Sequence, residues 1–260
     1  SIVYLYNNGT ILGGGGNGGG GGQERDAICG GDTPGGTGGT GGDAVAGDDV
    51  YTAVLPAQAN RVLVRYRIVV ADTLGATRRA PFEDDPSLNF ACYVYDGVPS
   101  YQGVTAQQLQ TVPVFSLISR PQDVDECTAY IGAYQIPQYF GSYAHPGRFV
   151  FNWPGTLVYD GVVYDNIHYR LRGANGRYLP GKRSWRFEMN RGHYLEARDQ
   201  FGNKFARKWA HLTTGKGSDN RLVLSFGLNE VVNYFLWNKV GVPAPDALFF
   251  HFRVVDGAAE

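Results

Sequence analysis

The sequence predicts an α+β protein that is mainly β, for three reasons. Alternating apolar and polar runs rich in β-branched and aromatic residues recur from residue 49 onward, and each has the length of one strand. Clusters of Gly, Pro and Asp separate these runs and predict turns. Residues 225–240 show a helical spacing of apolar side chains. The 260 residues, 43% of them hydrophobic, suffice for one or two cores.

The N-terminal segment, residues 1–47, is a glycine-rich arm. It contains 19 of the 37 glycines, so it has few side chains whose burial could offset the entropic cost of ordering. Disorder is the first expectation. The alternative is that polyglycine packs as extended, polyproline-II-like strands, because no Cβ keeps the backbones apart. Residues 2–6, ahead of the glycine run, read as a strand.

Residues 48–118 are expected to form an antiparallel, β-sandwich-like module. Its predicted strands cover residues 50–55, 61–70, 90–95 and 112–119. Residues 119–154 contain Pro, Tyr and Gln and are expected to connect this module to the next unit, with a helical turn near residues 123–127. We assign no chemistry to this part of the chain.

The three cysteines, Cys29, Cys92 and Cys127, lack the spacing of a metal site. The preferred disulfide joins Cys92 to Cys127, because both lie beside segments expected to be ordered. Three unpaired thiols are the alternative. The sequence begins at Ser1 without a methionine, which indicates a removed leader or an internal piece of a longer chain.

Residues 155–260 are expected to form the second unit. A hairpin is predicted over residues 157–172, because Asp160-Gly161 is a strong two-residue turn signal between alternating runs. Residues 182–189 form the next predicted strand. The helix over residues 225–240 takes Ser225 as its N-cap, places its apolar side chains on one face and ends before Gly241.

Charge is distributed unevenly along the chain. Residues 1–167 hold 8 Lys and Arg against 16 Asp and Glu, whereas residues 168–221 hold 13 against 4. A basic block of this density favours an anionic ligand such as a nucleotide phosphate or a polyanion. The alternative is a solvated basic sheet face that the acidic first half neutralises.

Several functional classes lack support in the sequence. The glycine run is followed by no Gly-Lys-Ser/Thr, so it is not a phosphate-binding P-loop, and no Gly-x-Ser-x-Gly or His-Glu-x-x-His motif occurs. His193 and His211 have no carboxylate or cysteine at a catalytic or metal-binding spacing and are expected to be structural. No apolar run reaches the length of a membrane span.

Two segments carry a family resemblance. Residues 164–189, YDNIHYRLRGANGRYLPGKRSWRFEM, end a strand in Arg-x-Arg-Gly and continue with Lys-Arg-Ser-aromatic-Arg-hydrophobic, and Gly-Val-Pro-Ala-Pro follows the expected helix at residues 241–245. This pattern resembles the CotH-type (spore coat protein H-like) atypical kinase family over about 100 of the 260 residues. Residues 50–76 resemble the end of the immunoglobulin-like or fibronectin-like module found upstream of CotH domains.

The resemblance implies that residues 155–260 are the N-terminal part of a kinase-like domain. It implies the use of ATP with Mg or Mn, the phosphorylation of extracellular or coat proteins, and a secreted or cell-surface location. Phosphoryl transfer needs a cation on the nucleotide phosphates and a carboxylate that holds this cation. The candidate nucleotide- or anion-binding residues are Arg172, Lys182, Arg183, Arg186 and Glu230.

These candidates have separate expected roles. Arg172 covers phosphates from a tight turn, and one of Lys182, Arg183 and Arg186 contacts them directly. Strand alternation is expected to place Arg186 on the same face as Lys182. Glu230, the one carboxylate of the helix, orients that cation. The alternatives are a solvent-facing sheet surface for the cations and a surface helix position for Glu230.

One departure limits what the resemblance implies. In the family, the aspartates that bind metal and act as the base follow the Gly-Val-Pro-Ala-Pro segment, whereas this sequence ends at Glu260. We therefore assign no catalytic residue and no metal site, and expect nucleotide or anion binding at most. The rival hypothesis is a structural or adhesive extracellular protein that forms filaments or homo-oligomers or contacts surfaces through its glycine-rich arm. Neither hypothesis includes a specific nucleic-acid partner or a membrane span.

Overall fold

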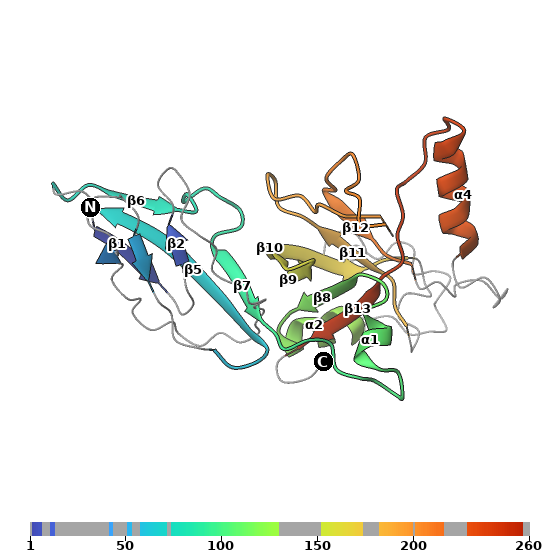
Figure 1. Ribbon diagram of the computed structural model, residues 1–260, viewed down its shortest axis with the longest axis horizontal. Helices are drawn as coiled ribbons and strands as arrows, with labels where there is room; N and C mark the ends of the chain where they lie inside the picture. The colour runs from blue at the N-terminus through green and yellow to red at the C-terminus, as the bar shows by residue number, and fades with distance from the viewer. Residues whose placement is uncertain are drawn as a thin grey trace.

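The computed structural model of the protein describes residues 58–71, 74–129, 152–173, 182–199, 201–215 and 228–256, together with the backbone of short strands at 2–6, 11–13, 42–43 and 51–53. The fold is α+β and mainly β, as the sequence predicts, because strands dominate and few helices accompany them. Figure 1 shows two β units side by side. Most of the glycine-rich arm lies outside the described residues.

The first unit is an antiparallel sheet built around one long strand, β5 (Val62–Ala71). Its first half pairs with β7 (Phe90–Val94), and its second half pairs with β1 (Ile2–Tyr6) on one side and β6 (Thr77–Ala80) on the other. The β-branched run of β5 suits a strand flanked on both sides. The predicted strands at residues 2–6, 61–70 and 90–95 are thus confirmed.

A second, small sheet has the order β2-β4-β3. It consists of β2 (Ile11–Gly13), β4 (Tyr51–Ala53) and β3 (Gly42–Asp43). The strand predicted over residues 50–55 is therefore present as β4, and it pairs with two strands from the glycine-rich arm.

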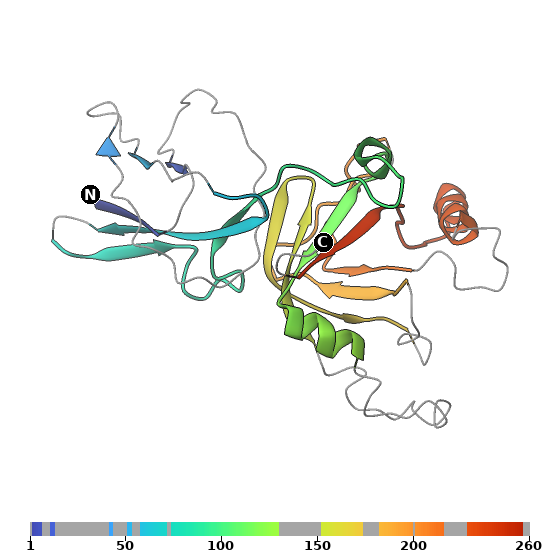
Figure 2. The same ribbon diagram turned by 90° about the horizontal axis from the view of Figure 1, so that it is seen from below.

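The second unit is a six-stranded sheet with the order β12-β11-β10-β9-β8-β13. Its strands are β8 (Val114–Ile118), β9 (Trp153–Tyr159), β10 (Val162–Leu171), β11 (Trp185–Glu188), β12 (His211–Thr213) and β13 (His251–Val255). All neighbours are antiparallel except β8 and β13, which run parallel. Figure 2 shows this sheet from below, with α2 (Pro121–Ala129) packed against it.

The hairpin of β9 and β10 follows the predicted turn. Val162 pairs with Tyr159, so Asp160 and Gly161 form a two-residue loop, and both have positive φ, at 52° and 72°. Positive φ at both loop residues is the geometry that matches the twist of the flanking strands. Farther along, the register shifts between Tyr164 and Ile167, which is a β-bulge.

The six-stranded sheet curls around the main core. Phe252 on β13, at one edge of the sheet, has its ring centroid 5.6 Å from that of Trp185 on β11, near the opposite edge. Between them the sheet buries a layer of large side chains, among them Phe115, Leu157, Tyr169 and Phe187. This curvature creates a concave side, and the concave side carries the candidate site.

Two boundaries differ from the sequence-based expectation. β8 lies within the predicted module of residues 48–118, and α2 lies within the predicted connector of residues 119–154, yet both belong to the second unit. The physical reason is burial: four of the five residues of β8 are buried, so it needs neighbours on both sides and cover on both faces. An apolar run in the sequence does not say which sheet it joins.

The preferred disulfide is absent from the structure, in which Cys92 and Cys127 are both free thiols. Cys92 lies on β7 in the first sheet, paired with Val64 of β5, whereas Cys127 on α2 is buried in the core of the second unit. The two cysteines therefore belong to different units. Cys29 lies outside the described residues.

The helix predicted over residues 225–240 is present as α4 (Leu228–Lys239), and Gly241, with φ of +82°, follows its end as expected. Ser225, its predicted N-cap, lies outside the described residues. α4 buries none of its residues, and it stands apart from the sheet in Figures 1 and 2. Its predicted apolar face is thus largely exposed. Another short helix, α1 (Ala106–Leu109), has a capping box between Thr105 and Gln108.

The two units meet through a second hydrophobic cluster. Leu63 and Tyr93 from the first sheet pack with Ile118, Val158 and Val255 from the second. Tyr93 and Val255 are both fully buried in this contact. Side chains of the first unit therefore cover part of the second sheet and share a hydrophobic cluster with it.

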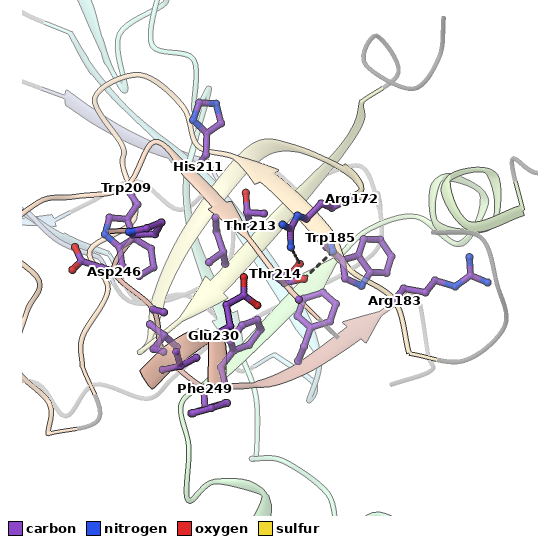
Figure 3. Close-up of a pocket in the computed structure, with 18 of the residues that line it drawn as sticks. Arg172, Arg183, Trp185, Trp209, His211, Thr213, Thr214, Glu230, Asp246 and Phe249 are labelled. Atoms are coloured by element: carbon purple, nitrogen blue, oxygen red, sulfur yellow. Dashed lines mark hydrogen bonds between the residues drawn. The ribbon is translucent and has the colours of Figure 1, made fainter. Parts of the chain in front are cut away.

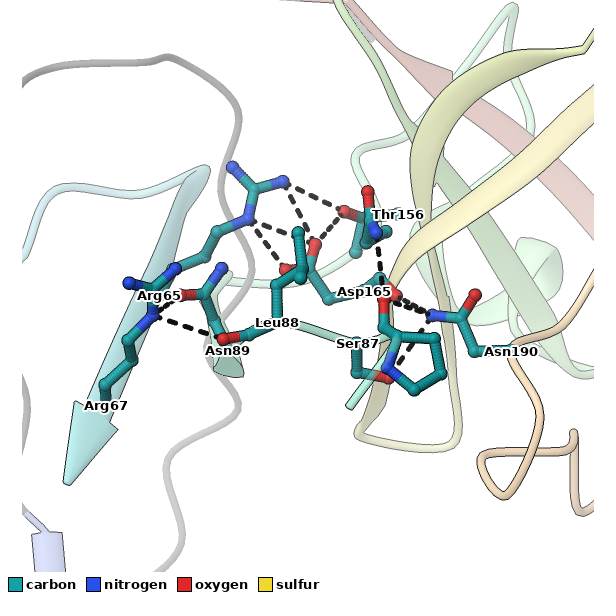
Figure 4. A network of polar contacts seen from close by, with 10 residues as sticks. Arg65, Arg67, Ser87, Leu88, Asn89, Thr156, Asp165 and Asn190 are labelled. Carbon is teal, nitrogen blue, oxygen red and sulfur yellow. Dashed lines mark hydrogen bonds and ion pairs between the residues drawn. The ribbon is translucent and has the colours of Figure 1, made fainter. Parts of the chain in front are cut away.

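A polar network completes this interface (Figure 4). The side chain of Asp165 is 3% exposed and accepts hydrogen bonds from Arg65 across the interface, with Arg65 Nε 2.9 Å from Oδ2, and from Thr156 Oγ1 at 2.6 Å. Nearby, Asn166 and Asn190 both donate to the carbonyl of Pro86. The β-bulge at residues 165–166 directs Asp165 toward the first unit, so a local irregularity produces a long-range contact.

Candidate functional site

The concave side of the second sheet opens into a groove of about 1110 Å³. Its walls come from α2, the end of β10, the segment entering β11, the region around β12, α4, and the extended segment that leads into β13. These parts are far apart in the sequence. The curl of the sheet brings them together, and the volume lies slightly above the usual range for sites that hold small molecules.

The floor of the groove is aromatic. Trp185, Phe250 and Phe252 line it, and the ring centroids of Phe252 lie 5.6 Å from Trp185 and 6.3 Å from Phe250. Trp185 is buried, so the floor is set by core packing. Such a floor can accept a flat apolar group, because aromatic rings favour stacked and tilted contacts.

The rim of the groove is basic. The groove is lined by five basic side chains and three carboxylates. The basic side chains are Arg172, Lys182, Arg183, Arg207 and Lys208. Their carboxylate counterparts are Glu230, Asp246 and Asp256. The groove therefore combines an apolar floor with an excess of cations at its edge, and this arrangement favours ligands that have a flat apolar part and an anionic part.

Arg172 directly follows β10, and its backbone N–H donates to the carbonyl of Ser184 at 2.8 Å. Its guanidinium reaches across to the carbonyl of Thr214 at 3.4 Å, as Figure 3 shows. Thr214 is itself fixed, because its Oγ1 accepts a hydrogen bond from the backbone N–H of Trp185 at 2.8 Å. Arg172 thus projects from a part of the groove wall that hydrogen bonds tie to the start of β11.

Lys182 and Arg183 line the groove from the segment before β11, not from the strand. Lys182 is exposed, and no hydrogen bond or ion pair joins it to any other described residue. Arg183 differs, since its guanidinium donates to the carbonyl of Thr128 at 2.7 Å and so caps the C-terminal turn of α2. Arg183 is therefore already used to hold a helix end.

Arg186 does not line the groove, and this differs from the expected alternation. The expectation assumed one continuous strand from residue 182, but β11 begins at Trp185, whose side chain faces the concave side. Its neighbour Arg186 therefore faces the other side of the sheet. Of the three cations considered in this segment, Lys182 and Arg183 reach the groove and Arg186 does not.

Glu230 does line the groove, from the first turn of α4. Its carboxylate accepts a hydrogen bond from the hydroxyl of Tyr234, one turn later, at 3.0 Å. No ion pair joins it to Arg172, Lys182 or Arg183 among the described contacts. The hydrogen bond to Glu230, followed by desolvation, raises the pKa of Tyr234, while the positive charge of Arg172 lowers it.

Tyr234 and Thr214 also line the groove, and neither was among the residues predicted from the sequence. The spacing of Glu230 and Tyr234, four residues apart on a predicted helix, could have indicated a side-chain pair. No comparable signal marks Thr214, because its role depends on the pairing of residues near it with β11.

The two histidines differ in position. His193 Nε2 lies 3.0 Å from a carboxylate oxygen of Asp85, so it links the second unit to the first, as a structural residue would. His211 lines the groove on β12, with its Nε2 3.8 Å from Glu188. Within the described parts of the chain, no group of three or more His, Cys, Asp or Glu side chains is arranged to hold a metal ion. No described helix is both long and apolar enough to cross a membrane.

The chain matches no protein-family model, no curated protein and no solved structure.

Proposed function

We propose that the groove binds an anionic ligand of the nucleotide polyphosphate class with Mg²⁺ or Mn²⁺. We further propose that the chain is the nucleotide-binding part of a CotH-like atypical kinase that acts on extracellular or coat proteins. The observation that carries the proposal is convergence: Arg172, Lys182, Arg183 and Glu230 come from three separate segments and line one groove.

The chemistry of the groove supports this class of ligand. An arginine offers a planar fork of N–H donors that suits phosphate oxygens, and lysine offers a compact positive charge. Trp185 and Phe252 provide an apolar floor beside these cations. A nucleotide has both complementary parts, a flat base and a string of phosphates.

The rim cations Arg172 and Lys182 are exposed, so water and salt weaken their attraction for an anion. We therefore expect an affinity in the micromolar to millimolar range that falls as ionic strength rises. The proposal covers binding, and no described residue is assigned to the transfer of a phosphoryl group, which needs metal-holding carboxylates and a base.

The test is a titration of the protein with Mg·ATP at low and at moderate salt, by calorimetry. Lys182→Ala is expected to weaken binding about tenfold, a loss of about 1.4 kcal/mol. Arg186→Ala is the matched control, because it removes a cation of the same segment that does not line the groove. An unaltered protein that binds no nucleotide at millimolar concentration contradicts the proposal, and so do equal effects of the two substitutions.

A second candidate is a structural or adhesive protein that self-assembles. The observation that favours it is the apolar surface of α4, on which Leu228, Phe235 and Leu236 are each about half exposed. Light scattering and electron microscopy distinguish the two candidates. Concentration-dependent fibres or rings that do not respond to nucleotide favour the second.

A further inference from the structure

Both edges of the six-stranded sheet border the groove. β12 and β13 are the outermost strands of the sheet, and its curl turns both of them toward the groove, which His211, Thr213, Phe252 and Val254 line. Among the described residues, no further strand pairs with the outer edge of either. The groove therefore lies between two open strand edges.

The outer edge of β12 presents backbone groups without partners. In an antiparallel ladder, only alternate residues hydrogen-bond to a given neighbouring strand. The carbonyl of Ala210 and the N–H of Thr214 each form a hydrogen bond of 2.8 Å with the chain of β11. By this alternation, the N–H and C=O groups of His211 and Thr213 point away from β11, and no hydrogen bond joins them to another described residue. Figure 3 shows His211, Thr213 and Thr214 in succession along the edge of the groove.

The charges of the groove are separated between its two sides. All five basic side chains come from segments between the end of β10 and the start of β12, whereas the three carboxylates come from α4 and from the chain on either side of β13. The edge of β12 thus lies on the basic side. A strand that pairs with it meets Arg207 and Lys208 near one end, and near the other Arg172, whose guanidinium reaches Thr214.

These charges restrict which strand can pair with β12. Proteins usually blunt an exposed strand edge with proline, with charged side chains or with a covering segment, because such an edge pairs readily with other strands. β12 contains no proline, and the cations near it repel a basic strand and attract an acidic one. A second copy of β12 would bring like charges together. The fitting partner is therefore an acidic segment of another protein.

We propose that the edge of β12 binds an extended, acidic peptide segment of a partner protein, which adds a strand to the sheet. Backbone hydrogen bonds to His211 and Thr213 hold the segment, while its carboxylates meet the basic rim and its apolar side chains face the aromatic floor. The inference goes beyond the proposed function, because the ligand is a polypeptide and its binding needs no nucleotide.

The first test uses a fluorescein-labelled, ten-residue peptide that alternates valine with glutamate. Its binding to the full chain is followed by fluorescence anisotropy. The same peptide with lysine in place of glutamate is expected to bind at least about tenfold more weakly, because the basic rim repels it.

Two further peptides separate strand pairing from attraction between charges. One has N-methyl groups on its valines and the other on its glutamates, so both keep the charge, and each lacks the N–H donors of one edge. Only one edge of a peptide strand can face β12. One of the two forms is therefore expected to bind about tenfold more weakly than the unmethylated peptide, and the other to bind as well as it does.

Substitutions at Thr213 test the same contact from the protein. Thr213→Pro removes an N–H that points away from β11, and no charge, so it is expected to weaken peptide binding about tenfold. Thr213→Val keeps this N–H and is the matched control, with an expected change of less than about twofold. Urea denaturation first shows that both variants are folded.

Amide hydrogen exchange of the unaltered protein gives a readout that needs no variant. The bound peptide is expected to slow exchange at the N–H groups of His211 and Thr213, which gain partners. The N–H of Leu212 already faces β11, so its exchange is expected to change little.

Several outcomes overturn the inference. They are a Val-Glu peptide that does not bind at millimolar concentration, a lysine peptide that binds equally well, and equal binding by the two N-methylated forms. Dimers of the chain that Thr213→Pro abolishes would show that a second copy occupies the edge, and they would also overturn it. The Mg·ATP titration decides the proposed function separately, so either proposal can fail while the other stands.

Discussion

Asp165 shows at the scale of a single residue how the two β units are held together. Its buried carboxylate accepts hydrogen bonds both from Arg65 of the first unit and from Thr156 of its own unit. A buried carboxylate is costly unless its oxygens are paired, so each of these donors is needed.

Asp165→Asn is expected to destabilise the protein. Breaking a fully buried ion pair costs roughly 3–5 kcal/mol, and because the Arg65 side chain is 38% exposed we expect a smaller loss of about 2 kcal/mol. Urea denaturation measures this loss. Arg78→Gln, a charge removal at an exposed position of β6, is the control and is expected to change stability by less than about 0.5 kcal/mol. Equal stabilities of the two variants would contradict the assigned role of Asp165.

Asp85 links pH to stability at the same interface. Desolvation by itself would raise its pKa, but hydrogen bonds from the backbone N–H of Ser87 and from His193 lower it below the ordinary 3.8. A carboxyl whose pKa is lower in the folded state stabilises the protein above its unfolded pKa, and this contribution disappears as the pH falls through the folded pKa.

Near neutral pH, Asp85→Asn is expected to be less stable than the unaltered protein. This difference in stability is expected to shrink below about pH 4. Melting temperatures measured from pH 7 down to pH 2 check it. A difference that stays constant over this range would show that Asp85 contributes no pH-dependent interaction.

At the scale of the element, β9 depends on a glycine that lets it pass close to its neighbours. A Cβ on Gly155 would lie 3.0 Å from Tyr169 Cε1 and 3.1 Å from the carbonyl oxygen of Ile118. The backbone carbonyl cannot move away without disturbing the pairing of β8 with β9. The glycine is thus required by close packing and not by an unusual φ.

Gly155→Ala is expected to destabilise the protein by about 1–3 kcal/mol through overpacking. Gly215→Ala is the matched control, because the nearest atom to its Cβ is the guanidinium of Arg172 at 4.0 Å. Thermal and urea unfolding of both variants provide the measurement. If Gly155→Ala is as stable as Gly215→Ala, β9 can shift enough to accept the added methyl group, and the assigned role of Gly155 is wrong.

At the scale of the whole molecule, the first unit contributes to the core of the second. Tyr93 is fully buried between the two sheets, against Ile118, Val158 and Val255. The four tryptophans, Trp153, Trp185, Trp209 and Trp237, all belong to the second unit, so tryptophan fluorescence reports on the second unit alone. Tryptophan fluorescence can therefore show whether a substitution in the first unit changes the stability of the second unit.

Tyr93→Ala is expected to lower stability by about 3–5 kcal/mol and to shift the unfolding transition followed by tryptophan fluorescence by the same amount as the transition followed by circular dichroism. Phe82→Ala, an exposed aromatic of the first unit, is the control and is expected to shift neither. A tryptophan transition that does not move in Tyr93→Ala would mean that the two units unfold independently.

Local chemistry by itself determined the fold class and most of the elements. The Asp160-Gly161 turn, the strand at residues 61–70 and the helix that ends before Gly241 all depend on neighbouring residues in the sequence, and each was predicted close to its observed place. Contacts between side chains that lie far apart in the sequence could not be predicted in this way. The prediction of a Cys92–Cys127 disulfide was wrong for that reason.

Only the tertiary structure decided which candidates form the site. The curl of the sheet and the start of β11 at Trp185 place Arg172, Lys182 and Arg183 in one groove and turn Arg186 away. The tertiary structure also decided that Glu230 of α4 lines the groove while the apolar face of α4 stays largely exposed. Sequence patterns fix which residues share a face of one element, whereas the packing of distant elements fixes what that face meets.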